Sequence, residues 1–298
     1  MKQRISPCIW FDKEAIEAAE FYASVFPNSN VTFKTQIKGT PSGDCEIVGF
    51  RIMGFGIQAI SSRSPYKPTP SISIMVNFDP SHDKDARIRI NEVWEHLSID
   101  GKILMPLDQY EFSERYGWVE DKYGFSWQLV YTGPEGEGRP LVIPALLFVS
   151  EMCDKAEEAT DFYLSLFRNA KRGAIARYPA GMEPNKEGAF MFTDFTLEGQ
   201  WFAAMDGSTD MHDFAFNEAI SLVVNCEDQM EIDYYWANLS AFPKAEQCGW
   251  VRDKYGVSWQ ILPTSMNKWM SDHPDKIVPE MLKMRKIIIA DLERAIGL

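Results

Sequence analysis

The sequence has little of what marks a membrane, secreted or nucleic-acid-binding protein. Its longest uncharged apolar stretch, residues 142–149, is far shorter than the roughly 20 residues that span a bilayer. No basic start followed by an apolar core is seen, so we expect no signal peptide. Lys and Arg number 30 against 43 Asp and Glu, without a basic cluster. This charge argues against a nucleic-acid partner.

Cysteine is also scarce, and the five cysteines are widely separated, with no Cys-x-x-Cys pair. Free thiols in a reducing cytosol are the simplest interpretation, so we expect a cytoplasmic protein. The glycine-rich turn between a strand and a helix that a nucleotide-binding unit needs is missing as well. The 298 residues are enough for one large domain or two ordinary ones.

An internal repeat decides between one domain and two. Residues 117–128 and 249–260 are identical at ten of twelve positions, which chance does not produce within one chain. Further upstream, residues 72–77 match residues 220–225 in the same order of apolar and polar side chains. The chain therefore consists of two homologous halves.

The repeat divides the chain into four parts. They are a first domain, residues 1–132, a linker, residues 133–141, a second domain, residues 142–265, and a C-terminal helical tail, residues 266–298. The second domain is shorter, because Leu239 and Trp250 are 11 positions apart whereas the matching Leu97 and Trp118 are 21 apart. We therefore expect the second domain to lack a strand, and any ligand site to lie in the first.

Each half also contains a weaker repeat, in which the order of one helix and several strands occurs twice. The pattern of apolar residues predicts a strand over 5–11 and a helix over 14–25, and it restarts with a helix over 85–97. The other strands predicted in the first half are 31–38, 47–53, 57–61, 72–78, 103–107, 118–120 and 126–131. Each half thus reads as two βαβββ units of an α+β fold. In the tail, residues 279–296 are predicted to form one amphipathic helix.

These units carry motifs that resemble a known family. The motifs are Ile9-Trp10-Phe11 followed by residues 17–22, then residues 25–29, and the Gly-Trp-Val, Asp-Lys-Tyr-Gly and Ser-Trp-Gln groups that close both halves. They resemble the PhnB-like, or 3-demethylubiquinone 3-methyltransferase-like, branch of the vicinal oxygen chelate superfamily, which includes glyoxalase I and bleomycin-resistance proteins. The resemblance implies tandem domains of paired βαβββ units with a curved mixed sheet that forms a cup.

Metal enzymes of that superfamily take ligands, usually His and Glu, from the first and last strand of each unit. In this chain neither residues 5–11 nor residues 71–78 contain a His, Asp or Glu, and the positions resembling the usual Glu are Gln58 and Gln128. Neutral amides hydrogen-bond but do not offset the charge of a cation. We therefore expect neither a metal ion nor another cofactor.

The predicted ligand site comprises Trp10, Gln58, Met105, Trp127 and Gln128. The two glutamines would face each other across the cup and orient a polar ligand, or Gln128 would cap backbone groups beside Trp127. The tryptophans would either wall the pocket or fill the core with a satisfied indole N–H. Trp10 is favoured for the pocket because the second half has Phe148 in its place.

These features predict a metal-independent protein that binds a small molecule in the cup of the first domain. The alternative is a divalent-metal-dependent lyase, isomerase or dioxygenase of the glyoxalase superfamily. The sequence leaves open whether any reaction is catalysed. The expected partner is a small-molecule ligand, with a homodimer left open and neither nucleic acid nor a membrane expected.

Overall fold

The computed structural model describes residues 3–40, 43–133 and 138–298. In the first half the elements are β1 (Ile5–Phe11), α1 (Ala15–Val25), β2 (Asn30–Thr40), β3 (Gly43–Ile52), β4 (Phe55–Ser61), β5 (Ile72–Phe78), α2 (Ala86–Ser98), β6 (Lys102–Tyr110), β7 (Ser113–Glu120) and β8 (Ser126–Tyr131). In the second half they are β9 (Val142–Phe148), η1 (Ser150–Met152), α3 (Ala156–Leu166), β10 (Lys171–Arg177), β11 (Phe190–Leu197), β12 (Gln200–Asp206), β13 (Ile220–Cys226), α4 (Gln229–Leu239), η2 (Pro243–Ala245), β14 (Trp250–Arg252) and β15 (Ser258–Pro263). The tail holds α5 (Met266–Asp272), α6 (Pro274–Met281) and α7 (Ile289–Ile296).

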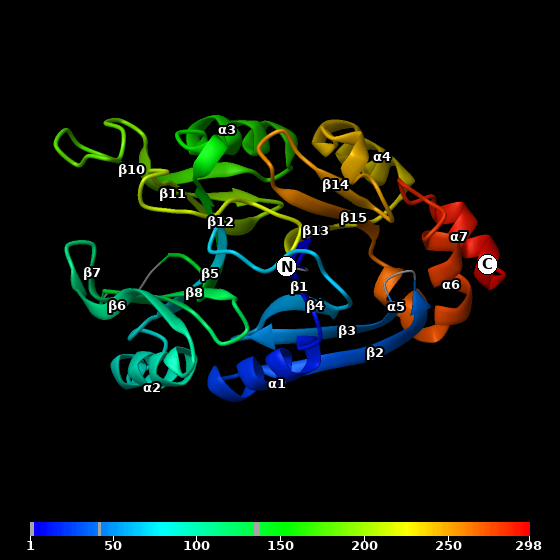
Figure 1. Ribbon diagram of the computed structural model, residues 1–298, viewed down its shortest axis with the longest axis horizontal. Helices are drawn as coiled ribbons and strands as arrows, with labels where there is room; N and C mark the ends of the chain where they lie inside the picture. The colour runs from blue at the N-terminus through cyan, green and yellow to red at the C-terminus, as the bar shows by residue number, and fades with distance from the viewer. Residues whose placement is uncertain (1–2, 41–42, 134–137) are drawn as a thin grey trace.

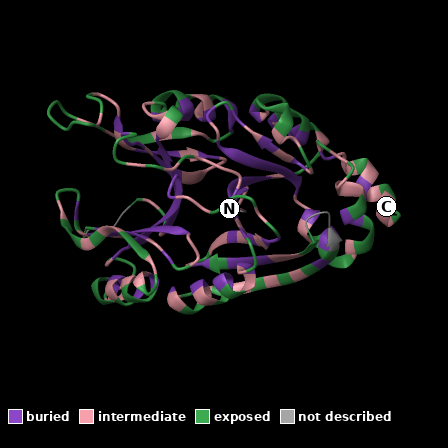
Figure 2. Ribbon diagram, viewed as in Figure 1, coloured by how far each residue is buried: buried purple, intermediate pink, exposed green. Residues whose placement is uncertain are grey.

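The predicted elements of the first half are confirmed, with shifted ends. Strands β1 and β5 are almost entirely buried because apolar residues occupy both of their faces. Helix α1 buries Ala15, Ala18, Ala19 and Tyr22, which recur at helical spacing. Figure 2 shows that buried residues gather along the central strands and that exposed residues lie on the outer sides of the helices. Local apolar patterning therefore accounts for the elements themselves.

The strands form two mixed sheets that do not follow the two halves of the sequence. Sheet A has the order β14-β15-β13-β1-β4-β3-β2, and sheet B has the order β10-β11-β12-β9-β5-β8-β7-β6. In sheet A, β1 pairs antiparallel with β13, and in sheet B, β5 pairs antiparallel with β9. Each sheet thus combines one unit of the first half with one unit of the second. The ranges 1–132 and 142–265 describe the sequence repeat, and neither range forms a cup by itself.

Helices α1 to α4 cover one face of each sheet, and α6 of the tail contacts β2 of sheet A. Helices α1 and α4 pack on sheet A, and α2 and α3 pack on sheet B. We call the face of sheet A that lies away from α1 and α4 cup A, and the face of sheet B that lies away from α2 and α3 cup B. In Figure 1 sheet A extends toward the C-terminal helices, and sheet B extends to the opposite side, where its edge strands β10 and β6 lie apart from each other. These two faces carry the polar side chains of the central strands.

Sheet A is shorter at its β14 edge, as the spacing between Leu239 and Trp250 predicted. Residues 240–249 form the η2 turn and a bridge between Gln247 and Trp250, where the first half has strand β6. The tail continues this edge, because the backbone N–H groups of Cys248 and Gly249 donate to carbonyl groups at 284 and 285. Sheet B is complete at the matching edge, where β6 pairs with β7.

The tail differs from the predicted single helix over 279–296. It is broken between Met281 and Ile289, because the intervening chain pairs with the edge of sheet A. The side chain of Ile287 is fully buried there, beside Gly249. The apolar residues of the tail thus pack on the domain. Within the part of the chain that the structure describes, no helix is long and apolar enough to cross a bilayer.

Candidate functional site

Four side chains lie together on the inner face of sheet A. Cys8 of β1 is paired in register with Gln58 of β4 on one side and with Ser221 of β13 on the other. The amide of Gln260, from β15, donates to Ser221 Oγ over 2.9 Å. Residues directly opposite in a ladder project to the same face, so these four side chains form the floor of cup A. Two come from each half of the chain.

Sheet B repeats the same geometry with different side chains. Ser73 of β5 is paired with Ala145 of β9, and Ala145 is paired with Ala203 of β12. The amide of Gln128 donates to Ser73 Oγ over 2.7 Å. The serine–glutamine pair is therefore common to both cups. The thiol and the second amide of cup A are replaced by methyl groups in cup B.

The polar groups of cup A are only partly satisfied. The side-chain amide of Gln58 is half-buried and has no hydrogen-bond partner among the described residues. Ser258, paired with Ser221 in the β13–β15 ladder, is 1% exposed, and its Oγ is likewise without a partner in the described chain. Buried polar groups are usually hydrogen-bonded, and an unpaired one costs about 1–3 kcal/mol. Cup A therefore keeps free hydrogen-bonding capacity for a ligand.

Burial controls the thiol on the floor of cup A. It raises the pKa of Cys8 to about 12, although hydrogen bonds with Gln260 and Ser221 act in the opposite direction. The thiol is therefore protonated at neutral pH, and it is a weak nucleophile and a weak metal ligand in that form. In cup A it acts as a small, weakly polar surface.

Gln128 and Ser126 of cup B, in contrast, are satisfied by neighbouring side chains. Tyr116 Oη donates to the Gln128 carbonyl oxygen over 2.9 Å, and Trp118 Nε1 donates to Ser126 Oγ over 2.7 Å. Gln128 is only 3% exposed. The rest of the floor is apolar, from Met75, Ile143, Ala145 and Ala203. One further buried hydroxyl, Ser71, has no partner among the described residues and lies just before β5.

Behind the sheets, each half buries a carboxylate that holds the closing hairpin. Asp121 accepts from the backbone N–H groups of Tyr123 and Phe125 and from Trp127 Nε1. Asp253 accepts from the matching groups of its own half and also from Tyr163 Oη, over 2.7 Å. Burial raises the pKa of both carboxyl groups to about 6, while these hydrogen bonds lower it. Both groups are structural, since they lie on the helix-covered side.

The structure divides the predicted ligand-site residues among three places. Trp10 and Gln58 lie in cup A, and Trp10 is half-buried with its Nε1 donating to the Ser62 carbonyl over 3.0 Å. Met105 and Gln128 lie in cup B. The two glutamines are in different sheets, so they do not face each other, and Gln128 bonds side chains and does not cap the backbone.

The remaining predicted residue, Trp127, does not lie in a cup. It is fully buried on the helix-covered face, with its ring centroid 5.0 Å from that of Tyr22 in α1. It belongs to the core. The register also corrects the comparison used for Trp10, because Trp10 pairs with Ile60 as Leu147 pairs with Met205. The matching residue of the second half is thus Leu147, one position before Phe148.

The donor chemistry of the two floors does not suit a divalent metal ion. Cup A offers a thiol, two amides and a hydroxyl, and cup B offers one amide and one hydroxyl. Hard divalent cations prefer carboxylate and other oxygen ligands, and transition metal ions such as zinc or nickel also take imidazole or a deprotonated thiol. Across residues 3–40, 43–133 and 138–298, no group of three or more His, Cys, Asp or Glu side chains could hold a metal ion.

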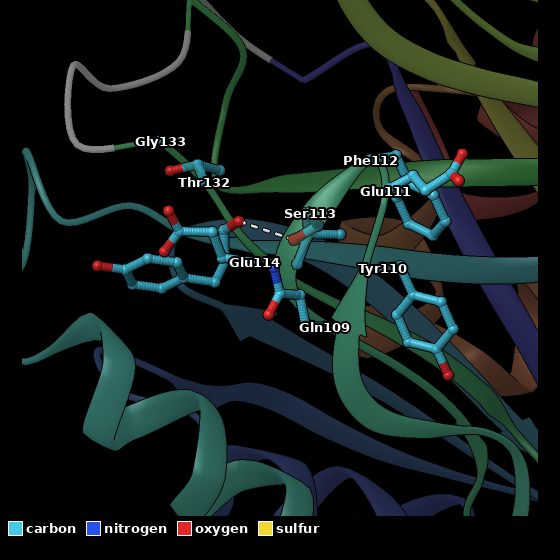
Figure 3. A pocket seen from close by; sticks show the side chains of 10 residues that line it. Gln109, Tyr110, Glu111, Phe112, Ser113, Glu114, Thr132 and Gly133 are labelled. Carbon is cyan, nitrogen blue, oxygen red and sulfur yellow. Dashed lines mark hydrogen bonds between the residues drawn. The ribbon is translucent and has the colours of Figure 1, made fainter.

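Two hollows open elsewhere on the surface. One of about 340 Å³ lies beside the β6–β7 hairpin, and Figure 3 shows Tyr110 and Phe112 on one side of it and Glu114 and Thr132 on the other. Phe112 is 65% exposed and stacks on Tyr110 with ring centroids 5.6 Å apart. The other, of about 400 Å³, lies among the β3–β4 turn, the β11–β12 turn and the start of β9. Neither is lined by residues of the cup A floor.

Sequence reasoning missed the contribution of the second half to cup A. Ser221, Ser258 and Gln260 come from that half, and so does Trp250, whose ring centroid lies 6.0 Å from that of Trp10. The repeat contained a signal for this contribution. When the two copies of the motif are aligned, one of the two mismatches is Arg252 at the position of Glu120. This change of charge inside a motif that is otherwise kept indicates that the two inner faces differ in charge.

Comparison with known proteins also divides the chain into two halves. A family model described as 3-demethylubiquinone-9 3-methyltransferase matches the chain twice, over residues 3–130 and 140–262. A search among curated proteins gave no match. A PhnB protein from Bacillus cereus is 31% identical over 44% of this chain and 100% of its own, with a TM-score of 0.39.

One solved structure shares the architecture over most of the chain. Glyoxalase I from Zea mays covers 90% of this chain and 98% of its own at 9% identity, with a TM-score of 0.52. The fosfomycin resistance protein FosX from Listeria monocytogenes covers 43% of this chain and 91% of its own at 13% identity, with a TM-score of 0.31. At 9% identity the likeness to glyoxalase I shows the fold alone. The predicted α+β fold of tandem glyoxalase-type domains, made of paired βαβββ units, is confirmed.

Proposed function

The chain belongs to the 3-demethylubiquinone-9 3-methyltransferase family, and from that premise we propose that it binds a small molecule in cup A without a divalent metal ion. One observation carries the proposal. The Gln58 amide and the Ser258 hydroxyl lie on one inner face and have no hydrogen-bond partner among the described residues. A ligand that hydrogen-bonds the buried Ser258 hydroxyl recovers the free energy that the desolvation of this group costs, and the half-buried Gln58 amide can orient that ligand.

The walls of cup A support the same proposal. Trp10 and Trp250 lie on the inner face, because Trp10 is two residues from Cys8 and Trp250 is paired with Gln260. Small-molecule sites are mostly apolar and aromatic, with a few polar groups that orient the ligand. In cup A the aromatic rings would supply contact area. Gln58 and Ser258 would supply orientation.

Cup A replaces the cup of the first domain as the proposed location. Sheet A unites the first unit with the shortened last unit, and the tail closes its short edge. The truncation therefore does not leave the cup open at that edge. Methyl transfer, which the family description names, is not part of the proposal, since the sequence lacks the glycine-rich strand-to-helix turn typical of a nucleotide-type cofactor.

Native mass spectrometry of the freshly purified full chain tests the proposal. We expect a co-purified small molecule on the wild type that is lost in Gln58→Ala, because the unpaired amide is an anchor. The matched control is Gln128→Ala in cup B, where the amide already bonds Tyr116 and Ser73. This variant should keep the small molecule.

Three results would contradict the proposal. They are an absence of any small molecule on the wild type, its loss from the Gln128 variant alone, and its retention by the Gln58 variant. Calorimetric titration with Mn²⁺ and Ni²⁺ addresses the metal. A stoichiometric divalent ion whose binding depends on Gln58 or Gln260 would overturn metal independence and favour the lyase, isomerase or dioxygenase alternative.

A further inference from the structure

A guanidinium and a hydroxyl lie opposite each other at the β14 edge of cup A. Arg252 is paired with Ser258 in the antiparallel β14–β15 ladder, and Ser258 is paired with Ser221 in the β13–β15 ladder. All three therefore project to the inner face. The β14 edge of cup A therefore carries the positively charged guanidinium of Arg252 next to the hydroxyl of Ser258.

Both groups have unused hydrogen-bonding capacity. Arg252 Nε and Ser258 Oγ are buried atoms that have no hydrogen-bond partner in the part of the chain the structure describes. The guanidinium is held in place by Glu218, whose Oε1 lies 3.5 Å from Nη1, and by Phe242, whose ring centroid lies 4.5 Å from Cζ. These contacts fix its orientation while leaving Nε unpaired.

The matching position in cup B has the opposite character. Glu120 is paired there with Ser126, and Ser126 Oγ accepts from Trp118 Nε1 over 2.7 Å. In cup A the corresponding indole, that of Trp250, lies against Trp10. Between the two copies of the repeat, Glu120 is thus replaced by Arg252. The hydroxyl beside it is hydrogen-bonded in cup B, as Ser126, and has no partner among the described residues in cup A, as Ser258.

We infer that Arg252 and Ser258 form the subsite for a carboxylate group of the small molecule in cup A. This inference rests on the proposed function. Guanidinium N–H groups match the two oxygens of a carboxylate, and a hydroxyl adds a further donor. Glu218 already offsets part of the positive charge, which favours a monoanion over a doubly charged phosphate. The nearby Trp10 and Trp250 suit an aromatic body.

The test compares two probes of nearly equal shape, benzoate and its neutral amide benzamide, binding to the full chain by calorimetry. We expect the wild type to bind benzoate about tenfold more tightly than benzamide. Arg252→Gln should remove this preference, and Ser258→Ala should weaken benzoate by about threefold. The matched control in cup B, Glu120→Gln, should bind both probes as the wild type does.

A conservative variant protects the test against misfolding. Arg252→Lys keeps the charge but not the fork of N–H groups, so an intermediate affinity for benzoate is expected. Thermal unfolding of each variant checks that the fold is kept. A lysine variant that binds benzoate no better than benzamide, in a folded protein, would overturn the subsite.

The remaining outcomes separate this inference from the proposed function. Equal affinities for benzoate and benzamide, both reduced in Gln58→Ala, overturn the carboxylate subsite and leave binding in cup A standing. If neither probe binds, the inference of an aromatic carboxylate fails, whereas the native mass spectra still decide on cup A. Displacement of benzoate by equimolar inorganic phosphate would reassign the subsite to free phosphate and so overturn the inference.

Discussion

Cup A and cup B are built on the same plan and differ in what their polar groups do. Both floors carry a serine bonded by a glutamine, Ser221 with Gln260 and Ser73 with Gln128. In cup B a tyrosine, Tyr116, satisfies the glutamine, and at the matching place in sheet A stands Cys248, whose backbone pairs with the tail. Cup B thus satisfies Gln128 and Ser126, whereas the matching Ser258 of cup A has no hydrogen-bond partner among the described residues.

This difference teaches that the two halves share the carboxylates that support the sheets and differ at particular positions on the inner faces. The carboxylates behind the sheets, Asp121 and Asp253, each bond the indole of the following Ser-Trp-Gln group. In contrast, Cys8 and Gln58 on the floor of cup A match Ala145 and Ala203 of cup B. These two inner-face positions therefore differ between the halves, whereas the supporting carboxylates are the same.

The largest loss of stability should come from removing either buried carboxylate behind the sheets, Asp121 or Asp253. Asp253→Ala leaves four buried donors without an acceptor, and Asp121→Ala leaves three. We expect each to lower the free energy of unfolding by about 4 kcal/mol, with the larger loss at 253. Urea denaturation measures both. A loss below about 1 kcal/mol at either site would show that the two halves do not rely on the same support.

A somewhat smaller effect should distinguish the edges of the two sheets. Ile287 is fully buried where the tail meets the short edge of sheet A, so Ile287→Ala should cost about 3 kcal/mol. The matched control is Ile103→Ala in β6, where the side chain is 52% exposed and the cost should stay within about 0.5 kcal/mol. Thermal and urea unfolding compare them. Equal costs would mean that the tail does not replace the missing strand.

The smallest effect should come from opening the network of cup B. Tyr116→Phe removes the donor to the Gln128 carbonyl oxygen, which should lower the free energy of unfolding by about 1 kcal/mol. Benzoate binding should remain at the wild-type level, because the variant lies in the other cup. A changed affinity would show that the two cups are coupled and would weaken the contrast between them.

Individual residues show which features follow from neighbours in the sequence and which depend on distant residues. The strand that carries Gln58 and the helix that carries Tyr22 follow from apolar periodicity, which involves neighbours within a few positions. The pairing of Cys8 with Ser221 spans most of the chain, and no local pattern encodes it. The predicted meeting of Gln58 and Gln128 failed for this reason, since it assumed that each half closes on itself.

The face on which a tryptophan lies was also beyond the sequence. Trp127 and Trp118 are both apolar residues of adjacent strands, and side chains of a strand alternate between faces. Only the packing of α1 against Trp127, and the bond from Trp118 to Ser126, assign one to the core and the other to cup B. A shift of one residue in register exchanges the two faces.

By itself, the sequence determined the two homologous halves, their βαβββ units, the shortened last unit and the neutral residues at the expected ligand positions. Tertiary structure alone decided that each sheet joins one unit of each half, that the tail closes the short edge, and that Arg252 and Ser258 share a face with Gln58. The physical reason is the distance along the sequence between the residues that interact. Secondary structure depends on neighbouring residues, whereas a cup is assembled from strands more than 200 residues apart, such as β1 and β13.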